Sequence, residues 1–404
     1  MADLSTNFLP NPDEVNLGKG WPGPHALEKA AKVFDIASSH CMNHSEVISN
    51  FMNYGPENGN EHFRQVLADF LSRQYQSQVL ADELYVTAGS TFGLSLLGDV
   101  LFEAGDVVYI EDPTYFLVFS VLETCKLSTK CVSTDEEGII PSALEEAIVQ
   151  HNATHATRPL TETKPYRGMI YLIPTFHNPT GKCLSPERCK QIIATARRHN
   201  LLIVCDDVYN LLYFTDKPPT RLYSYDIKTD PNYVGSVVSN CSFSKAFSPA
   251  VRLGWIEAPY KILKLVASSG IAVGSGCFNH MMSGFMASVI SQGHLDDVIK
   301  EYRTLNELQS RAISDVFEKE MPKEVHFSQP MGGYYVWVTL PEGMNAQDVM
   351  DECFRKFKIS FRPGNKFSAS GNFKNCFRIC FAFYNVDTLR FAAKKIISVI
   401  QNHL

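Results

Sequence analysis

The sequence lacks several features that mark whole classes of protein. It has no long run of like charge, and its formal net charge of −6 gives none of the basic excess expected of nucleic-acid or anionic-membrane binding. No stretch approaches the roughly 18 consecutive apolar residues of a membrane span. The eleven cysteines form no CxxC pair and have no histidines at metal-ligand spacing. We therefore expect no nucleic-acid partner, no membrane partner and no metal.

The start of the chain also lacks a targeting signal. Residues 1–15 contain no basic segment and no apolar core, and they carry early acidic residues. The scattered cysteines are read as reduced thiols, since cysteine is commonly buried in the core of intracellular proteins. We expect a cytoplasmic location.

What the sequence does contain is an alternation of apolar runs and amphipathic stretches over 404 residues, enough for two lobes with a large core. Helical spacing of apolar residues recurs between short buried-strand patterns, which is typical of a parallel sheet with crossover helices. The predicted strands are 83–89, 106–112, 167–174, 201–207, 236–243 and 252–259, and the predicted helices are 62–74, 92–104, 142–151 and 186–200.

The pattern changes after a long helical stretch at 296–320. Short strands at 332–340, 358–363 and 376–382, a helix at 346–357 and a closing helix predict a smaller α+β lobe. The first 45 or so residues are rich in proline and glycine, so we expect them to pack on that lobe or on a partner subunit. Residues 151–168 are polar and aperiodic, which predicts a surface loop.

The stretch SFSKAFSPAVRLGW, residues 242–255, places Lys245 directly after an apolar run. A lysine at the carboxyl edge of a sheet loses hydration, so its neutral amine is favoured and can attack a carbonyl to form a Schiff base. A solvated surface lysine is the alternative reading. The cofactor that uses such chemistry is pyridoxal phosphate, which needs a phosphate cradle, an acid at the ring nitrogen, a donor to the phenolate oxygen and a stacking surface.

Candidates for the phosphate cradle lie at a predicted strand-to-helix junction. Gly89, Ser90 and Thr91 would present backbone N–H groups and a helix dipole to an anion, although an ordinary helix cap explains the same residues. Further donors around the lysine are Ser242, Ser244 and Arg252.

Candidates for the cofactor ring follow other predicted strands. Asp206 ends the strand at 201–207 and can pair with the ring nitrogen, with Asp207 as the alternative acid. Tyr209 would reach the phenolate oxygen if its segment turns helical. Asn178 lies in an HNPTG turn, and Tyr115 can stack on the ring, although turn chemistry and core packing explain these residues equally well.

A substrate needs an anchor as well. Arg378 is a charge inside an apolar strand pattern and suits a carboxylate, with a structural salt bridge as the alternative. Arg362 and Lys19 are candidates for a second carboxylate, but either could be structural or solvated. The aromatic residues Trp21, Phe116 and Tyr334 would suit a bulky side chain and are equally well explained by core packing.

Taken together, the motifs resemble the fold-type I, class I/II aminotransferase family of pyridoxal-phosphate enzymes, and within it the 2-aminoadipate/aromatic aminotransferase-like branch. The match covers nearly the whole chain and includes, in order, VNLGKGWPGP, YGPENGN, AGSTFGL, EDPTYF, HNPTG, DDVY, SFSKAFSPAVRLGW, GGYYVW and CFRICFA. The resemblance implies an α/β fold with a mainly parallel seven-stranded sheet covered by helices. It also implies an arm at 1–45, a large cofactor domain at 46–310 and a small domain at 311–404.

The resemblance also implies a role for each candidate residue. Lys245 would hold the cofactor and move the proton, Asp206 would pair with the ring nitrogen, and Arg378 would bind the substrate carboxylate. Asn178 and Tyr209 would bind the phenolate oxygen, Asn178 would also lie near the substrate, and Tyr115 would stack on the ring. The phosphate would be bound by Ser90, Thr91, Ser242 and Arg252, and by Tyr54 from the neighbouring subunit of a homodimer. The backbone of Gly20 would lie beside the substrate.

The implied activity is a ping-pong transamination between an L-amino acid and a 2-oxo acid. Two alternatives remain open at this point. The same catalytic set serves lyases and cyclases, such as carbon–sulfur β-lyases or aminocyclopropane-carboxylate synthases, and a non-catalytic protein could bind pyridoxal phosphate or an amino acid. The same branch supplies effector domains of transcription regulators, but we expect no winged-helix module before the catalytic lobe.

Overall fold

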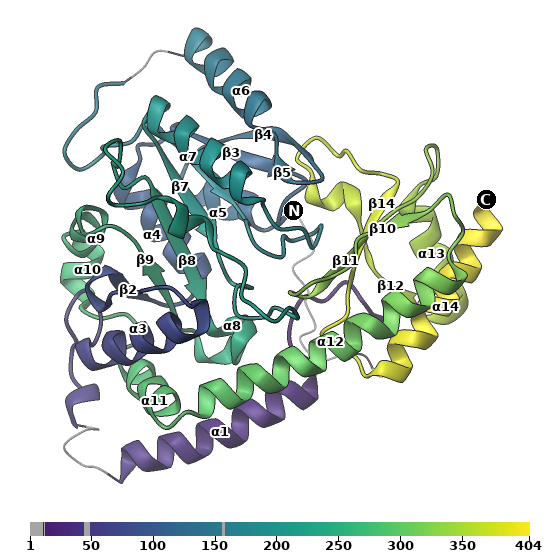
Figure 1. The fold of residues 1–404 in the computed structure, drawn as a ribbon, viewed down its shortest axis with the longest axis horizontal. Coiled ribbons are helices and arrows are strands. Elements are labelled where there is room, and N and C mark those ends of the chain that lie inside the picture. The colour runs from purple at the N-terminus through teal and green to yellow at the C-terminus, as the bar shows by residue number, and fades with distance from the viewer. Residues whose placement is uncertain (1–10, 12, 44–48, 156–157) are drawn as a thin grey trace.

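The chain folds into a large lobe and a smaller lobe that one long helix connects (Figure 1). This computed structural model describes residue 11 and residues 13–43, 49–155 and 158–404. The large lobe is built on an eight-stranded sheet with the order β2-β9-β8-β7-β6-β3-β4-β5. Its strands are β2 (Leu84–Thr87), β3 (Val107–Asp112), β4 (Ser128–Asp135), β5 (Gly138–Ile139), β6 (Gly168–Leu172), β7 (Leu201–Asp206), β8 (Val237–Ser242) and β9 (Gly254–Glu257).

The sheet is mainly parallel, which confirms the expected fold class. Strands β8, β7, β6, β3 and β4 run parallel, whereas β9 pairs antiparallel with both β8 and β2. Seven strands match the expected sheet, and the eighth, β5, is a two-residue strand antiparallel to β4. Because parallel strands share a direction, the carboxyl ends of β3, β6, β7 and β8 lie along one edge, where open α/β sheets form their sites.

Strand β4 was missed by the apolar pattern. Its sequence, STKCVSTD, is mostly polar, and most of its side chains are exposed or half-buried because little of the protein covers it. Backbone hydrogen bonds to the parallel strand β3 hold β4 in the sheet, although few of its side chains are buried.

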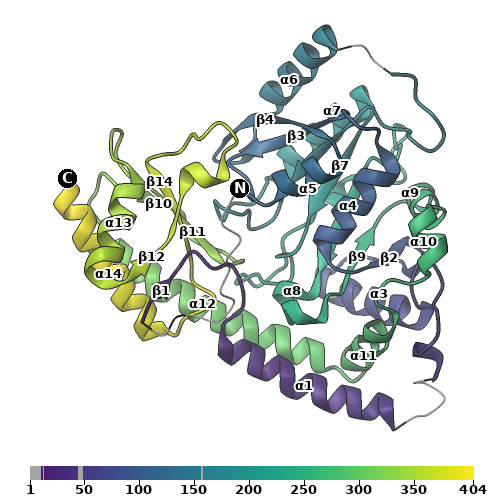
Figure 2. The same cartoon turned by 180° about the vertical axis from the view of Figure 1, so that it is seen from behind.

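Helices cover both faces of the large sheet (Figures 1 and 2). Helices α6 (Pro141–Thr154) and α7 (Pro186–His199) pack on one face. Helices α3 (Glu61–Tyr75), α4 (Ser90–Leu101), α9 (Tyr260–Ala267) and α11 (His280–Ser291) contribute to the larger core on the other. Ser185 caps the N-terminus of α7, since its side chain accepts a hydrogen bond from the Arg188 N–H. The helices of this lobe are α3 (Glu61–Tyr75), α4 (Ser90–Leu101), α5 (Val118–Thr124), α6 (Pro141–Thr154), α7 (Pro186–His199), α8 (Phe243–Ala246), α9 (Tyr260–Ala267), α10 (Gly270–Ser275) and α11 (His280–Ser291).

The N-terminal segment is more regular than its composition suggested. Residues 15–16 form β1 (Val15–Asn16), which pairs with β12 (Ile359–Ser360) of the small lobe. The 19-residue helix α1 (Pro24–Met42) follows, and it packs along α11 of the large lobe and along the long helix α12 (His294–Glu320). Its buried face is made mainly of alanine at helical spacing, a weak apolar signal, and Pro24 occupies the first turn.

The small lobe is an α+β unit, as predicted. Helix α12 (His294–Glu320) runs from the large lobe into it and packs against the C-terminal helix (Figure 1). The sequence-based boundary between residues 310 and 311 falls inside α12 and stays a prediction. The lobe contains β10 (His326–Phe327), β11 (Tyr335–Thr339), α13 (Ala346–Phe357), β12 (Ile359–Ser360), β13 (Arg362–Pro363), β14 (Cys376–Cys380) and α14 (Val386–His403), with the sheet order β10-β11-β14-β13.

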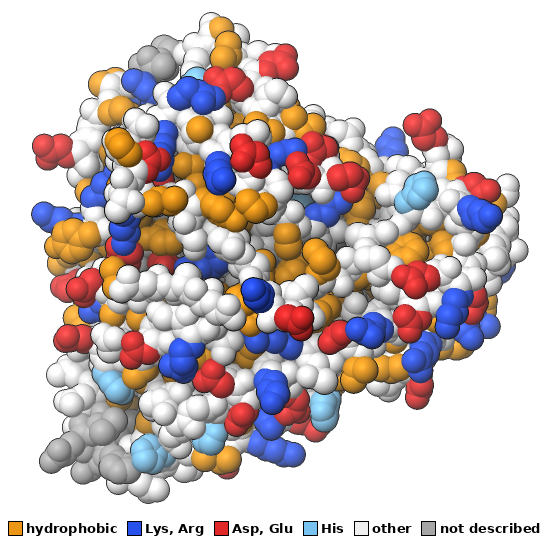
Figure 3. Space-filling view, in the orientation of Figure 1, with side chains coloured by type: hydrophobic (Ala, Val, Ile, Leu, Met, Phe, Trp, Pro, Cys, Tyr) orange, Lys and Arg blue, Asp and Glu red, His pale blue; other side chains and the backbone are white. Residues whose placement is uncertain are grey.

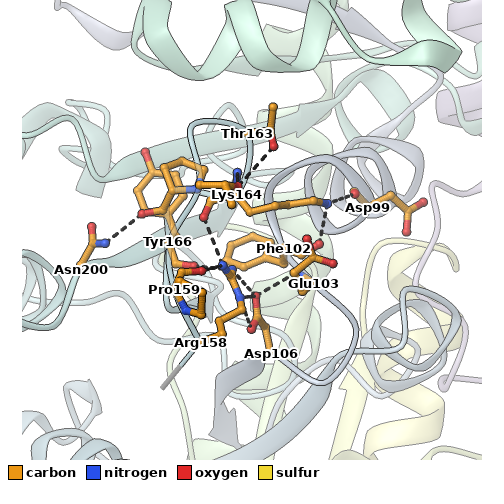
Figure 4. A network of polar contacts seen from close by, with 12 residues as sticks. Asp99, Phe102, Glu103, Asp106, Arg158, Pro159, Thr163, Lys164, Tyr166 and Asn200 are labelled. Atoms are coloured by element: carbon orange, nitrogen blue, oxygen red, sulfur yellow. Dashed lines mark hydrogen bonds and ion pairs between the residues drawn. The ribbon is translucent and has the colours of Figure 1, made fainter. Parts of the chain in front are cut away.

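The predicted surface loop after α6 is fastened to the large lobe (Figure 4). The Arg158 guanidinium donates to Asp106 at the start of β3, with its Nη2 2.7 Å from Asp106 Oδ2. The Lys164 ammonium donates to the carbonyls of Asp99 and Phe102, each at 2.6 Å. These two carbonyls lie at the C-terminal end of α4, where a lysine compensates carbonyls that have no helical partner.

Charged side chains of both signs are interspersed over the face shown in Figure 3. Among the described residues, no helix is both long enough and apolar enough to cross a membrane.

Candidate active site

Lys245 lies at the carboxyl edge of the large sheet, in the short helix α8 that follows β8. Its Nζ donates a 2.6 Å hydrogen bond to the backbone carbonyl of Gly20. Its own carbonyl accepts a hydrogen bond from the Tyr334 hydroxyl at 2.9 Å. Burial lowers the pKa of Lys245 to about 8. Part of the amine is therefore uncharged near neutral pH, where it can act as a nucleophile or a base.

Asp206 and Asp207 are adjacent at the end of β7, and their side chains have different surroundings. Asp206 Oδ2 accepts a 2.7 Å hydrogen bond from the Tyr171 hydroxyl, while its buried Oδ1 has no hydrogen-bond partner. Burial raises the pKa of Asp206 to about 6, and the nearby charge of Lys245 opposes this shift. Asp207 instead accepts a hydrogen bond from Ser239. Of the two candidate acids, Asp206 is the one that interacts with Lys245.

A site for an anion lies where β2 leads into α4. Gly89 is the N-cap residue of α4 and provides no side-chain hydrogen bond to the first turn, so the N–H groups of that turn stay available. The Arg252 guanidinium approaches this turn, with Nη2 3.3 Å from the Ala88 carbonyl. A Cβ at position 89 would lie 2.9 Å from Arg252 Nη2, and φ at Gly89 is 99°, so this approach depends on glycine. Ser90 and Thr91, the first two residues of α4, belong to this site.

The two serines before Lys245 have different surroundings. Ser242 is buried, and its hydroxyl accepts a 3.1 Å hydrogen bond from the Ser244 N–H to cap α8. Ser244 is the serine whose hydroxyl contacts Arg252, at 3.4 Å from Nη1. Of these two serines, Ser244 is the one that forms a hydrogen bond with the arginine.

Arg378 connects the two lobes with the N-terminal segment. Its Nη1 donates to Asn178 Oδ1 at 2.8 Å, and its Nη2 donates to the Gly18 carbonyl at 2.6 Å. Asn178 belongs to the turn after β6. Because its amide oxygen accepts the hydrogen bond from Arg378, its NH₂ group is left as a donor. A Cβ at position 20 would lie 2.3 Å from the Tyr335 hydroxyl, which requires glycine there. The segment 18–20 therefore runs between Lys245 and Arg378 and contacts both.

Three tyrosines extend this site. Tyr209 lies in a turn after β7 rather than in a helix, and its hydroxyl is 2.9 Å from that of Tyr335. The Tyr335 ring centroid lies 4.2 Å from the Arg378 guanidinium carbon. Burial raises the pKa of Tyr115 and of Tyr335, and the charges of Asp206 and Arg378 act on both hydroxyls. Both tyrosines therefore lie close to the acid and to the arginine.

Residues 13–396 match the family described as aminotransferase class I and II. The chain belongs to this family. The match covers both lobes, so it confirms the family resemblance drawn from the motifs. It also confirms an aminotransferase that works with pyridoxal phosphate.

Named relatives agree with this assignment. The 2-aminoadipate transaminase of Thermus thermophilus is 28% identical, over 92% of this chain and 86% of its own length. The aromatic-amino-acid aminotransferase 1 of Thermococcus litoralis is 26% identical, over 97% of this chain and 89% of its own length. The Pyrococcus horikoshii kynurenine aminotransferase, solved with PMP, superimposes with a TM-score of 0.83 at 25% identity, over 97% and 92% of the two chains. The chain thus shares the type I fold and the enzyme class with relatives whose names give different substrates.

The residues of this aminotransferase fit the cofactor. Pyridoxal phosphate presents a dianionic phosphate, a ring nitrogen that can carry a proton and an aldehyde. The first turn of α4 and Arg252 offer donors to the phosphate, Asp206 Oδ1 is a buried acceptor without a partner, and Lys245 is a buried amine with a lowered pKa. Each chemical requirement of the cofactor is therefore matched by a group at this edge of the sheet.

Some residues of this site were not singled out from the sequence. Tyr171, which donates to Asp206, is a hydroxyl inside the apolar strand β6, and this polar group was the available signal. Tyr335 is adjacent to Tyr334 in GGYYVW, and only the pairing of β11 with β14 in the small lobe reveals its contact with Arg378.

Tyr54, which the resemblance places at the phosphate of the neighbouring subunit, lies on the surface of this chain. It is 85% exposed. Its neighbour Gly55 accepts a hydrogen bond from the Cys277 N–H at 3.0 Å, which fixes this segment against the turn before α11. The predicted contact across a subunit interface remains a prediction.

Proposed function

We propose that this aminotransferase uses Lys245 as its acid–base residue in a ping-pong exchange between an L-amino acid and a 2-oxo acid. The proposal rests on one observation above all. Lys245, a buried lysine with a pKa of about 8, shares a site with the buried carboxylate of Asp206 and with Arg378, which forms no ion pair among the described residues. An acid–base group works best when its pKa lies near the working pH. The lowered pKa of Lys245 meets that condition.

Each remaining group has a defined task in this proposal. Bound pyridoxal phosphate supplies an aldehyde and an electron-withdrawing ring. Asp206 would hold the protonated ring nitrogen through Oδ1, and Tyr171 keeps the other carboxylate oxygen in place. Arg378 binds the α-carboxylate of the amino acid, and this orientation lets Lys245 remove the proton from Cα.

Other groups position the cofactor and limit water. Asn178 and Tyr209 would bind the phenolate oxygen, and the half-buried Tyr115 would stack on the ring. The phosphate would be held by Arg252 and by the first turn of α4, where Ser90 and Thr91 begin the helix, with Ser242 and Ser244 beside it. Gly20 leaves room for the Tyr335 hydroxyl. Its carbonyl accepts a hydrogen bond from the Lys245 amine, and this bond would break when the amine reacts.

We also propose a homodimer in which Tyr54 completes the phosphate site of the partner subunit. Tyr54 and Met52 are exposed apolar residues, 85% and 69% accessible, and Met281 of α11 is exposed as well. Hydrophobic side chains gathered on one face favour association. A mixture of Lys245→Ala and Tyr54→Ala proteins tests this arrangement, because a mixed dimer contains one site with both native residues. Activity that neither variant shows alone supports a shared site, whereas additive residual activity contradicts it.

The state of the cysteines bears on the cellular location. All eleven are free thiols, and most are buried. We propose that the enzyme works in the reducing cytoplasm. Loss of activity under oxidising refolding, with recovery on reduction, is the expected result.

Replacement of Lys245 by Ala tests the catalytic assignment. We expect kcat to fall roughly 10⁴-fold or more, the upper range for one acid–base group, together with loss of the borohydride-fixed cofactor. Lys261→Ala is a matched control, because Lys261 also donates to a backbone carbonyl, that of Val234, and burial also lowers its pKa. It lies in α9, so turnover is expected to stay at the native level. Full activity of Lys245→Ala refutes the assignment.

Product analysis separates transamination from the alternatives. We expect a new amino acid and a new 2-oxo acid in equal amounts, formed only when an acceptor is present. Release of pyruvate and ammonia without an acceptor would identify a lyase on the same site. An absorbance spectrum that does not respond to any amino donor would identify a binding protein.

A further inference from the structure

Arg362 lies directly beside Arg378 in the small lobe. The two residues are cross-strand partners in the antiparallel pair β13 and β14, so their side chains leave the same face of the sheet. Like charges in this position repel each other and are destabilising. The sequence therefore places a second positive charge next to the substrate-carboxylate arginine at a cost in stability.

No carboxylate in the described part of the chain forms an ion pair with either of these arginines. Among the residues that the structure describes, neither Arg362 nor Arg378 forms an ion pair, and the Nε atoms of both are buried without a hydrogen-bond partner. Burial lowers the pKa of Arg362, and the charge of Arg378 lowers it further. Because an arginine stays protonated in proteins, two adjacent buried arginines are unfavourable until an anion compensates their charge.

The surroundings of Arg362 belong to the active site. Its guanidinium carbon is 5.4 Å from the ring centroid of Phe116, the residue after Tyr115. Phe116 packs on Phe367 at 5.6 Å between ring centroids, and Arg378 lies 4.9 Å from that same Phe367 ring. A backbone hydrogen bond of 2.9 Å from Thr114 to Phe367 fastens this part of the small lobe to the loop after β3. Both arginines thus border one aromatic-lined region.

Each other cation of this region already has a task or lies elsewhere. Arg252 lies at the first turn of α4, in the predicted phosphate site. Lys19, the other sequence candidate for a second carboxylate, places its Nζ 5.4 Å from the Trp21 ring centroid and has no strand partner beside Arg378. The α-carboxylate of a substrate carries one charge and so compensates Arg378 alone. Arg362 remains without a counterion.

We propose that Arg362 binds the side-chain carboxylate of a dicarboxylic L-amino acid, and of the matching 2-oxo acid, while Arg378 binds the α-carboxylate. This inference rests on the proposed transaminase function and adds the substrate class. The planar guanidinium of arginine matches a carboxylate bidentately, and the rings of Phe116 and Phe367 provide apolar walls for the methylene groups between the two carboxylates.

The test compares an acidic donor with its neutral isostere on the holoenzyme. L-Glutamate and L-glutamine differ in charge but hardly in shape, and L-2-aminoadipate with L-norleucine extends the comparison by one methylene. The loss of cofactor absorbance on donor addition reports the first half-reaction. For the native enzyme we expect kcat/KM for the better acidic donor to exceed that of its neutral counterpart about 100-fold, the effect of one desolvated charge pair.

Three variants assign that preference to a residue. Arg362→Met keeps the length of the side chain and is expected to lower kcat/KM for acidic donors about 100-fold while changing neutral donors by less than about threefold. Arg362→Lys keeps the charge but loses the fork, so a preference of about tenfold is expected to remain. Lys19→Met is expected to leave the preference at the native value. Thermal unfolding of each variant checks that the fold is kept, and Arg362→Lys carries the test if Arg362→Met does not fold.

Several results would overturn the proposal. Equal use of acidic and neutral donors by the native enzyme excludes a second-carboxylate site. A uniform loss with all donors in Arg362→Met shows that Arg362 only supports Arg378 or the fold. A selective loss in Lys19→Met assigns the second carboxylate to the other candidate.

A binding measurement separates this proposal from the proposed function. Glutarate and pentanoate have the same chain length, lack an amino group and differ by one carboxylate. Calorimetric titration of the holoenzyme is expected to show tighter binding of glutarate, and this difference is expected to vanish in Arg362→Met. If no amino acid converts the cofactor but the glutarate difference holds, transamination fails and the second-carboxylate site stands. If donors react but glutarate and pentanoate bind alike, the function stands and the site fails.

Discussion

Arg221 and Arg378 occupy two buried regions of the molecule, and each is only 2% exposed. Each also stacks on a tyrosine: Arg221 lies 4.0 Å from the ring centroid of Tyr75, and Arg378 lies 4.2 Å from that of Tyr335. Their charged partners differ. Arg221 forms an ion pair with the buried Glu257, while Arg378 contacts an amide oxygen and a backbone carbonyl.

The comparison separates a structural charge from one available to a ligand. The positive charge of Arg221 is compensated by Glu257 and is close to Asp207, so this region needs no ligand to balance its charge. Arg378 is buried and forms no ion pair with any carboxylate in the part of the chain that the structure describes. A buried arginine without a carboxylate is unfavourable in the protein alone, and this imbalance is what a substrate carboxylate relieves.

The largest expected effect comes from Arg378→Met. We expect kcat/KM to fall about 10³-fold with every amino donor, because each loses the partner of its α-carboxylate. The unfolding temperature is expected to change little, since the variant removes a charge that no acid compensates. Steady-state kinetics with several donors, together with thermal unfolding, checks both statements.

A different outcome for Arg378→Met would break the comparison. If the variant unfolds readily while the folded fraction keeps native kinetics, Arg378 is a structural residue like Arg221. Arg378→Lys gives an intermediate case, because the charge is kept and the bidentate fork is lost.

Arg221→Met is expected to show the reverse behaviour. Removing one member of a buried pair leaves Glu257 without its partner, and this typically costs about 3–5 kcal/mol of stability. The kinetics of the folded enzyme are expected to stay near native, because the pair lies away from Lys245. Urea unfolding of Arg221→Met and of Arg221→Met/Glu257→Leu provides the measurement, and the double variant is expected to recover part of the loss. Equal stability of the native protein and the single variant contradicts the structural role.

The difference between these two regions was only partly visible in the sequence. Lys245, Asp206 and Asn178 were predictable, because each follows an apolar run and parallel strands bring such residues to one edge. Glu257 ends the apolar run of β9 and was not recognised as the partner of Arg221. The same local pattern describes a charge that has a partner and one that lacks it, so Arg378 kept two readings until the fold was known.

Long-range contacts account for most of what the sequence could not provide. The bond from Arg378 to Asn178 joins residues 200 positions apart, and that from Lys245 to Gly20 spans 225. No local periodicity encodes such pairs. Strand β4 and helix α1 were missed for a local reason, since polar edge residues and alanines give weak apolar patterns.

The smallest expected effect is a shift in a pH profile, which sharpens the comparison at Lys245. Burial lowers the pKa of this amine from its ordinary value of 10.5 to about 8, while the negative charge of Asp206 acts to raise it. Only the neutral amine reacts with an aldehyde, so the rate of covalent pyridoxal phosphate attachment to the cofactor-free protein is expected to rise about tenfold per pH unit below 8 and to level off above it.

In Asp206→Asn the supporting negative charge is lost, so the pKa of Lys245 falls and the profile moves to lower pH. Lys261→Ala leaves the profile in place. Attachment is measured by borohydride trapping and peptide mapping at Lys245. A midpoint near 10.5 would show that the amine is hydrated, and an unshifted profile in Asp206→Asn would show that the two groups do not interact. Either result would contradict the proposed electrostatic difference between the region around Lys245 and the region around Arg221, whose charges compensate one another.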